Sequence, residues 1–452
     1  MLKALSMSAA VACLAGVAFG VGPDVTLQDI QSISTFGPVN GQYAYIVGSH
    51  TCNRGTSNLL WTNNGTPGLA SNVYRLHNGR LMHLGLSHAK TACCAAAGGG
   101  PCGSCNGAGG SVLGAGCLDV YSSGWNSGQG RLAPRNRINP VSGVFSSYPQ
   151  STGNAIFRRA QVPVADMNAT NFPGAIYFVE GVYVGTDDAQ NNNENNNATY
   201  KRATLGANGV LSPTPVSGGA VEGVPAIRAW RDHGLGLNQP DPRVEIATLD
   251  VPGDGRFWVA TKVTQNGPAS WTYDYAIFNL SSDKSAGSLS LPIPSGVNIT
   301  NVGFHAPDYH SDEPFSNADW VTARTDSSFG WSTPETFSQN ANASALRWGT
   351  MYSFWFTADA PPASGNATLG LFKVNDGSSV TFAAPFPKCD TIDFNHDTLF
   401  PSNDDLEDFL AVFGGDTSCT TCGDIDFNND GLFPDNNDIS HFFAVYGGAS
   451  CQ

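Results

Sequence analysis

Two acidic segments near the C-terminus repeat the same residue types 33 positions apart. The aligned positions are Asp393, Asn395 and Asp397 in the first repeat and Asp426, Asn428 and Asp430 in the second. Alternate residues of a tight loop can direct short oxygen-bearing side chains at one centre, which suits a hard cation that takes six to eight oxygen ligands. The D-x-N-x-D spacing therefore predicts one calcium loop in each repeat.

Each loop needs further oxygen ligands after its third acidic residue. Leu399 and Leu432 stand two positions on and would offer backbone carbonyls. A standard loop closes at the twelfth residue, which is aspartate in the first repeat and asparagine in the second. The thirteenth residue is aspartate in both repeats and precedes an apolar residue, so we expect Asp405 and Asp438 to close the loops.

The two loops differ at the position where the chain must turn sharply. The second repeat has Gly431 there, and the first has Thr398. Glycine adopts such turns without steric cost, whereas a β-branched residue does not. We therefore expect the second site to bind calcium more tightly than the first.

An apolar stripe follows each loop with the i, i+3, i+4, i+7 spacing of a short helix. The stripes consist of Leu406, Phe409, Leu410 and Phe413 in the first repeat and of Ile439, Phe442, Phe443 and Tyr446 in the second. Paired glycines stop both helices. Each repeat thus reads as a loop with an exit helix, and the two stripes can bury each other.

The segments "DFNHDTLFP" and "DFNNDGLFP" resemble the dockerin type I repeat, in particular a bacterial variant found in tandem at the ends of secreted proteins. The resemblance covers residues 389–452 and implies a small helical module that binds Ca²⁺. The loops have one extra residue, and the family's Ser-Thr recognition pair is absent, so the resemblance extends to calcium rather than to a cohesin partner.

Cysteines bracket the two repeats. Cys419 and Cys422 are spaced as half of a zinc site would be. Because each repeat begins and ends with a cysteine, we instead expect the disulfides Cys389–Cys419 and Cys422–Cys451. Ten cysteines follow residue 20, and an even number in an exported chain favours disulfides.

Charge is concentrated in the repeats. Residues 389–452 hold 13 of the 37 acidic side chains and none of the 22 basic ones, so residues 1–388 are nearly neutral. No basic patch suggests nucleic acid as a partner. Thirteen carboxylates without a counter-charge in one short module repel one another, which again favours a bound cation.

The first twenty residues are typical of a secretory signal peptide, with Lys3, an apolar stretch and small residues before Val21. No later segment is apolar and long enough to cross a bilayer. The sequence thus predicts a protein that is secreted, extracellular or attached to the cell surface.

Serial strands separated by Gly, Pro, Asn or Ser predict a mainly β protein with an antiparallel β-sandwich body. Asn78-Gly79 between two alternating runs is a strong hairpin signal. We expect a signal peptide over 1–20, a Cys/Gly-rich β region over 21–150, a β-sandwich over 151–386, and the disulfide-bonded α-helical module over 389–452.

Several body residues are candidates for chemistry. Paired carboxylates can hydrolyse glycosides, and Glu180 with Asp187 and Asp188 are the candidates, although a structural carboxylate near an arginine is the default interpretation. Four histidines and nearby acids can be read as a metal site or as core histidines. They are His83, His88, His305 and His310, with Asp308, Asp312 and Glu313.

The segment "ALRWGTMYSFWF" places Arg347 and Trp355 on one predicted face, where they would suit a flat sugar. Segments such as "GFHAPDYHSDEPF" are similar to a family of exported bacterial proteins, which implies a β-rich extracellular body. No nucleophile motif or phosphate loop is present. The sequence favours a calcium-binding protein whose body binds extracellular polysaccharide or a surface protein; the alternative is a secreted hydrolase of O-glycosyl bonds carrying the module as its attachment.

Overall fold

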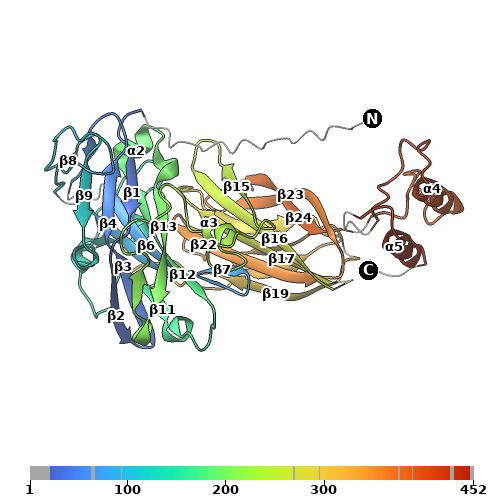
Figure 1. Ribbon diagram of the computed structural model, residues 1–452, viewed down its shortest axis with the longest axis horizontal. Coiled ribbons are helices and arrows are strands. Elements are labelled where there is room, and N and C mark those ends of the chain that lie inside the picture. The colour runs from blue at the N-terminus through green and yellow to red at the C-terminus, as the bar shows by residue number, and fades with distance from the viewer. Residues whose placement is uncertain are drawn as a thin grey trace, which may run out of the picture.

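The computed structural model describes residues 21–62, 67–92, 94–267, 270–294, 296–374, 377–388, 390–427 and 432–447. The chain is mainly β, with antiparallel sheets forming the body and two helices forming a separate module at the C-terminal end (Figure 1). The expected fold class is confirmed. The predicted signal peptide over 1–20 lies outside the described residues.

A six-stranded antiparallel sheet is the centre of the N-terminal unit. Its strands in spatial order are β10 (Leu132–Ala133), β7 (Arg80–Thr91), β6 (Gly68–His77), β12 (Ile176–Val184), β13 (Ala198–Leu205) and β14 (Leu211–Pro213). Asn78 and Gly79 have φ values of 49° and 70°, so the β6–β7 hairpin turns where the sequence predicts.

Smaller sheets cover one face of this central sheet. The first contains β1 (Val25–Asp29), β4 (Ser49–Asn53) and β9 (Leu118–Tyr121); the second contains β11 (Ala160–Pro163), β3 (Gln42–Val47) and β2 (Ile33–Val39); the third contains β5 (Leu59–Leu60) and β8 (Val112–Leu113). Their buried core includes Val25, Tyr45, Trp61, Val73 and Val179.

Two five-stranded sheets form the sandwich. One contains β15 (Glu245–Asp250), β16 (Arg256–Gly267), β17 (Ser270–Asn279), β22 (Thr350–Ala358) and β19 (Ile299–His305); the other contains β20 (Val321–Arg324), β21 (Phe329–Ser332), β18 (Ala286–Leu291), β23 (Pro362–Leu371) and β24 (Ser379–Pro387). Alternate residues of β22 point into the sandwich, where Phe354 and Phe356 pack with Trp331.

The sandwich packs against the free face of the six-stranded sheet. Tyr74 and Phe178 from that sheet share a buried cluster with Ala276, Phe278 and Met351 from the sandwich. The expected division at residue 150 does not follow the sheets, because β12 pairs with β6 along its whole length. Serial strands look alike in sequence, and only their pairing assigns them to a sheet. The N-terminal unit therefore continues through β14, and the sandwich begins at β15 (Figure 1).

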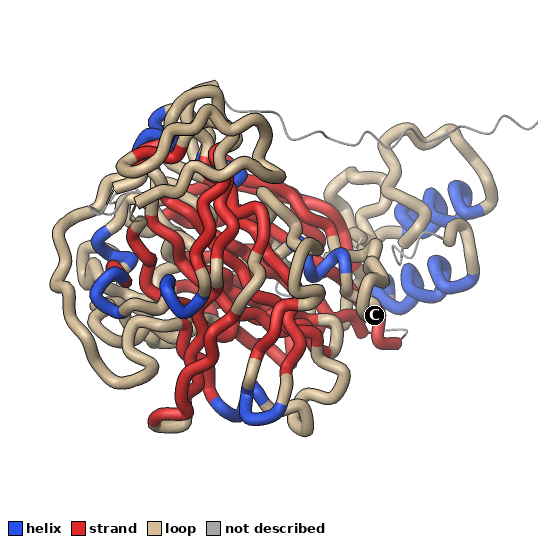
Figure 2. Tube along the Cα trace, turned by 60° about the vertical axis from the view of Figure 1, so that its left-hand side comes forward, coloured by secondary structure: helices blue, strands red, loops and turns tan. Residues whose placement is uncertain are grey.

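Short helices join these strands. They are α1 (Ser123–Asn126), α2 (Thr186–Gln190), α3 (Arg228–Asp232), and the 3-10 turns η1 (Gln129–Arg131), η2 (Arg135–Arg137), η3 (Val164–Met167), η4 (Glu194–Asn196) and η5 (Ala207–Gly209). Figure 2 shows how little of the body is helical compared with the C-terminal module.

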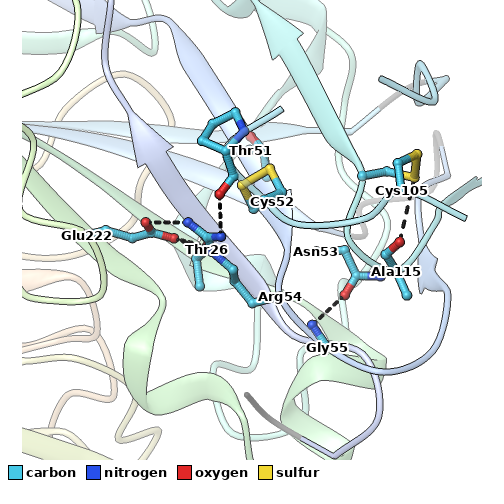
Figure 3. Close-up of a disulfide and its surroundings, with 12 residues drawn as sticks. Thr26, Thr51, Cys52, Asn53, Arg54, Gly55, Cys105, Ala115 and Glu222 are labelled. Atoms are coloured by element: carbon cyan, nitrogen blue, oxygen red, sulfur yellow. Dashed lines mark hydrogen bonds and ion pairs between the residues drawn. A yellow bond between two sulfur atoms is a disulfide. The ribbon is translucent and has the colours of Figure 1, made fainter. Parts of the chain in front are cut away.

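Disulfides hold the glycine-rich loops of the N-terminal unit, as the composition suggests. Cys52 pairs with Cys102, and Cys105 pairs with Cys117 (Figure 3). Beside them, Arg54 forms a 2.7 Å ion pair with Glu222. Glu222 also accepts a hydrogen bond from the Thr26 hydroxyl at 2.6 Å, so it fastens the segment before α3 to β1.

The C-terminal module contains α4 (Asn403–Phe413) and α5 (Asn436–Tyr446). Four phenylalanines fill its core, namely Phe394, Phe409, Phe427 and Phe442. The Phe409 and Phe442 rings stack with centroids 3.9 Å apart, so the two predicted stripes do meet. Leu410 and Phe443, which the spacing assigns to the stripes, are 40% and 45% exposed because the buried face is narrower than the apolar pattern.

Replacing Phe409 by alanine should unfold the module selectively. A buried Phe→Ala change costs about 3–5 kcal/mol, and this ring stacks at the centre of a very small core. Hydrogen exchange of α4 and α5 in the full chain should rise strongly while the sheets stay protected. Leu410→Ala on the exposed face is the matched control and should change exchange little; equal effects of the two variants would show that the stacked pair is not central.

Candidate metal centre

The first acidic loop brings three carboxylates together. One oxygen from each of Asp393, Asp397 and Asp405 lies within 4.8 Å of the others. Among the residues described, no other group of three histidine, cysteine or acidic side chains comes as close. Like charges at such distances repel by about 1 kcal/mol per pair even in water. The cluster therefore has the chemistry of a cation site.

Asp393 tests whether this cluster fits a cation. Its side chain is only 8% exposed, and Oδ1 is buried without a hydrogen-bond partner. Its other oxygen accepts a hydrogen bond from the Thr398 amide at 3.1 Å. An unsatisfied buried oxygen is costly unless something else approaches it, and a bound cation would do so. The residues present fit a hard cation with oxygen ligands.

The remaining predicted ligands of the first loop lie beside this cluster. Asn395 Oδ1 accepts a hydrogen bond from the Asp397 amide at 3.1 Å, and its amide group donates to Asp408. The Leu399 amide donates to Asp397 Oδ1 at 2.8 Å, which curls the loop around the carboxylates. The loop is therefore ordered by its own side-chain oxygens, which is typical of Asx turns.

Of the two candidate closing residues, the thirteenth of the loop lies in the carboxylate cluster. Asp405 is fully buried and accepts hydrogen bonds from the Phe394 amide at 2.9 Å and the Ser402 amide at 3.0 Å. It also forms a capping box with Ser402 at the start of α4. The preceding Asp404 is exposed and outside the cluster. The start of α4 therefore positions Asp405, and not Asp404, beside Asp393 and Asp397.

The second loop repeats these features where it is described. Asp426 is 8% exposed, and Asp438 is fully buried in a capping box with Asp435. The Leu432 side chain is exposed, as Leu399 is. Asn428, Asp430 and Gly431 lie outside the described residues. In the first loop Thr398 has a φ of 71°, so the position predicted to need glycine does adopt a left-handed conformation.

The predicted cysteine pairing in the module is wrong. Cys419 pairs with Cys422, and their Cα atoms are 5.5 Å apart across a two-residue turn. That distance is normal for a disulfide, so near neighbours in the chain satisfy each other without spanning a repeat. The pairing also removes both thiolates from a zinc site. Cys389 and Cys451 lie outside the described residues.

The candidate catalytic carboxylates are structural. Glu180 is fully buried in β12 and accepts hydrogen bonds from the Asn72 amide at 2.7 Å, the Tyr74 hydroxyl at 2.7 Å and the Ala226 amide at 2.6 Å. Asn72 in turn accepts from Arg135 at 2.7 Å. Burial raises the pKa of Glu180, and these bonds oppose that rise. These contacts support the default interpretation that Glu180 is a structural carboxylate near an arginine.

Asp187 and Asp188 lie in α2, which follows the end of the strand β12 that contains Glu180. Asp188 is fully buried and accepts from the Val25 amide at 2.9 Å and Asn197 at 2.7 Å, so it ties β1 to α2. Asp187 accepts from the Leu60 amide at 2.7 Å. These contacts leave the hydrolase alternative without an exposed pair of carboxylates among its three candidates.

The fold brings the four histidines into one region, but their ring nitrogens contact backbone carbonyls or Asp312. His310 Nε2 lies 2.7 Å from the Leu86 carbonyl, and His305 Nε2 lies 2.9 Å from the His83 carbonyl. His88 Nε2 lies 2.9 Å from Asp312, which also pairs with Arg158. Burial lowers the pKa of His88 to about 4 and that of His310 to about 3. They act as neutral core histidines that fasten residues 305–313 to β7, rather than as metal ligands.

Two further acids complete this region. Glu313 accepts from the backbone amides of Arg135 and Asn136, and burial raises its pKa to about 7. Asp308 is exposed at its surface, and partial desolvation raises its pKa as well. The loop that follows β19 is thus held on the N-terminal unit by its histidine and acidic side chains.

Arg347 and Trp355 do not share a face. Arg347 precedes β22 and is 3% exposed, whereas Trp355 lies within β22 beneath the Arg80 guanidinium, 4.1 Å away. The Trp355 ring also covers Gly303, where a Cβ would lie within 2.0 Å of it. The strand begins after Arg347, so the alternation assumed from the sequence does not reach it. Trp355 therefore packs against Arg80 and Gly303 of the same chain.

Comparison with known proteins adds little to this geometry. No family model and no curated protein matches the chain. A crystal structure of the serine-rich repeat adhesion glycoprotein Srr1 from Streptococcus agalactiae is similar over 80% of this chain and 98% of that one, at 7% identity and a TM-score of 0.20. Within the described residues, no helix has the length and apolar character needed to cross a membrane.

The buried histidines predict a stability that falls in acid. The pKa of His88 is lower in the folded protein than in the unfolded chain, so its contribution is complete above about pH 6.5 and is lost as the pH falls towards 4. The loss amounts to about 3 kcal/mol at pH 4. Glu313 acts in the opposite sense, because its raised pKa makes the folded state lose stability as the pH rises from about 4.5 to 7.

His88→Gln, which keeps a donor near Asp312, should therefore flatten the fall in melting temperature between pH 7 and pH 4.5. His77→Gln, at a half-buried ring outside this region, is the control and should keep the wild-type dependence. An unchanged pH dependence in His88→Gln would show that other groups govern acid stability.

Proposed function

We propose that the C-terminal module binds two calcium ions, and that the protein is a secreted or cell-surface protein whose β-rich body binds an extracellular carbohydrate or surface partner. The observation that carries the calcium proposal is that carboxylate oxygens of Asp393, Asp397 and Asp405 lie close together, with Oδ1 of Asp393 buried and without a hydrogen-bond partner. A bound Ca²⁺ would neutralise this cluster and join the loop to the start of α4.

Two other features support this proposal. The same carboxylates and capping boxes recur in the second repeat, and the repeats resemble dockerin type I sequences. Disulfides Cys52–Cys102, Cys105–Cys117 and Cys419–Cys422 are typical of proteins in oxidising, extracellular compartments. The predicted signal segment agrees with export. The module lies at one end of the body, a position that suits attachment. The body would then bind the carbohydrate or surface partner.

Calcium titration of the full chain by calorimetry should show two binding events, in the range of roughly 10⁻⁴–10⁻³ M for extracellular sites. Asp397→Asn should weaken binding at the first site at least tenfold, because it removes a charged ligand that has no part in the capping box. Asp405→Asn should have a similar or larger effect. Asp404→Asn, the adjacent exposed residue with the same charge change, is the matched control.

Two results would contradict this proposal. An equal loss in Asp404→Asn and Asp405→Asn would mean that net charge, not a closing ligand at the thirteenth position, governs binding. Absence of any calcium-dependent heat in the wild type would remove the calcium sites altogether.

Thr398→Gly should tighten the first site. A β-branched residue in the left-handed region costs about 1–2 kcal/mol, and glycine removes this cost. The affinity of the first site should rise roughly fivefold, towards that of the second site. Thr417→Gly, outside the loop and exposed, controls for added flexibility. A first site that is unchanged or weaker in Thr398→Gly would show that the turn does not limit binding.

A further inference from the structure

A cavity of about 430 Å³ lies where the N-terminal unit meets the sandwich. One wall consists of η2 and the segment that follows it, and the other consists of the segments around Asp283, Phe315, Ala341 and Lys373. Ligand sites often occur at such junctions, because neither unit alone has to fill the space. We propose that this junction cavity binds an acidic saccharide, that is, a sugar carrying a carboxylate or sulfate group.

The charge of the lining favours an anion. Four cationic side chains line the cavity, and they are Arg135, Arg137, Arg347 and Lys373. The one lining carboxylate, Asp283, is already paired with Lys373 at 2.7 Å. Residues 1–388 as a whole are nearly neutral, so this excess of positive charge is local. A concave site with low-dielectric walls concentrates such a field on an incoming anion.

Two of these arginines have donors to spare. Arg347 is 3% exposed, and its Nη2 donates to the Ala341 and Ala343 carbonyls, but its Nε is buried without a partner. Arg137 is exposed and has neither an ion pair nor a side-chain hydrogen bond among the described residues. Arg135 differs, because its donors are taken up by Ser87, Gly349 and Asn72 and it supplies charge alone. An oxyanion would accept a hydrogen bond from the unpartnered Nε of Arg347 and form an ion pair with Arg137.

The remaining lining suits a sugar better than a bare inorganic anion. The Arg347 guanidinium lies 4.3 Å from the centre of the Phe315 ring, so a rigid cationic and aromatic surface is already built. Phe337 and Trp348 add apolar surface of the kind that packs against the C–H face of a pyranose. Asn136 and Asn342 place exposed amides beside it, and these can donate to and accept from hydroxyl groups.

This inference rests on the proposed binding role of the body and not on the calcium sites. The test therefore uses the full chain with excess chelator, which also prevents calcium from bridging acidic sugars. The probes are a galacturonic acid trisaccharide, its fully methyl-esterified form and inorganic sulfate, each titrated by calorimetry. The free acid should bind, the neutral ester should bind at least tenfold more weakly, and added salt should weaken the free acid only.

Variants locate the site. Arg137→Gln and Arg347→Gln should each reduce affinity for the free acid at least tenfold. Arg231→Gln is the matched control, since Arg231 is exposed on α3, outside the junction cavity, and its substitution changes the net charge equally. Arg137 is exposed, so its variant should keep the wild-type melting temperature and remain informative if Arg347→Gln fails to fold.

Each other outcome overturns part of the inference. Equal binding of acid and ester would reject the anionic specificity while keeping a carbohydrate-binding body, and tight binding of sulfate alone would reject the saccharide. An equal loss in Arg231→Gln would place the effect in overall charge rather than in the cavity. Failure of both the free acid and the ester to bind would reject this inference but not the proposed function, because the body could still bind another carbohydrate or a surface partner and the calcium titration decides the module separately.

Discussion

Arg135 is the constraint on which the arrangement of the body depends. Its buried guanidinium donates to Ser87 and Asn72 in the N-terminal unit and to the Gly349 carbonyl just before β22 in the sandwich. Asn72 donates to that same carbonyl and to Glu180. A buried charge without these partners would be costly, so the two units are held at the one separation that satisfies all of them.

The junction that Arg135 fixes determines what lies around it. The loop after β19 reaches back onto β7 through His88, His310 and Asp312, and Glu313 accepts from the Arg135 amide itself. The aligned units then leave a polar gap beside η2 that their side chains do not fill. Arg135 belongs both to this network and to the lining of the cavity, so the network that fixes the junction also contributes positive charge to the cavity.

Local patterns predicted the parts of this protein whose causes are local. The β6–β7 hairpin follows from Asn78-Gly79, and the place of Asp405 beside Asp393 and Asp397 follows from comparing two repeats residue by residue. The partners of Glu180 could not be predicted, because Asn72 reaches it only through sheet pairing and Ala226 only through the tertiary fold of the turn before α3. Pairing of Cys419 with its near neighbour was missed because symmetry of the repeats suggested a longer connection.

The body and the module solve opposite electrostatic problems. In the body, buried acids such as Glu180 and Asp188 are matched by amides, hydroxyls and a nearby arginine, so the fold needs nothing from solution. In the module, Asp393, Asp397 and Asp405 converge, and the sequence of 389–452 has no lysine or arginine to offset them. On the proposal that the module binds Ca²⁺, the stability of the module depends on a cation supplied from outside, whereas the stability of the body does not.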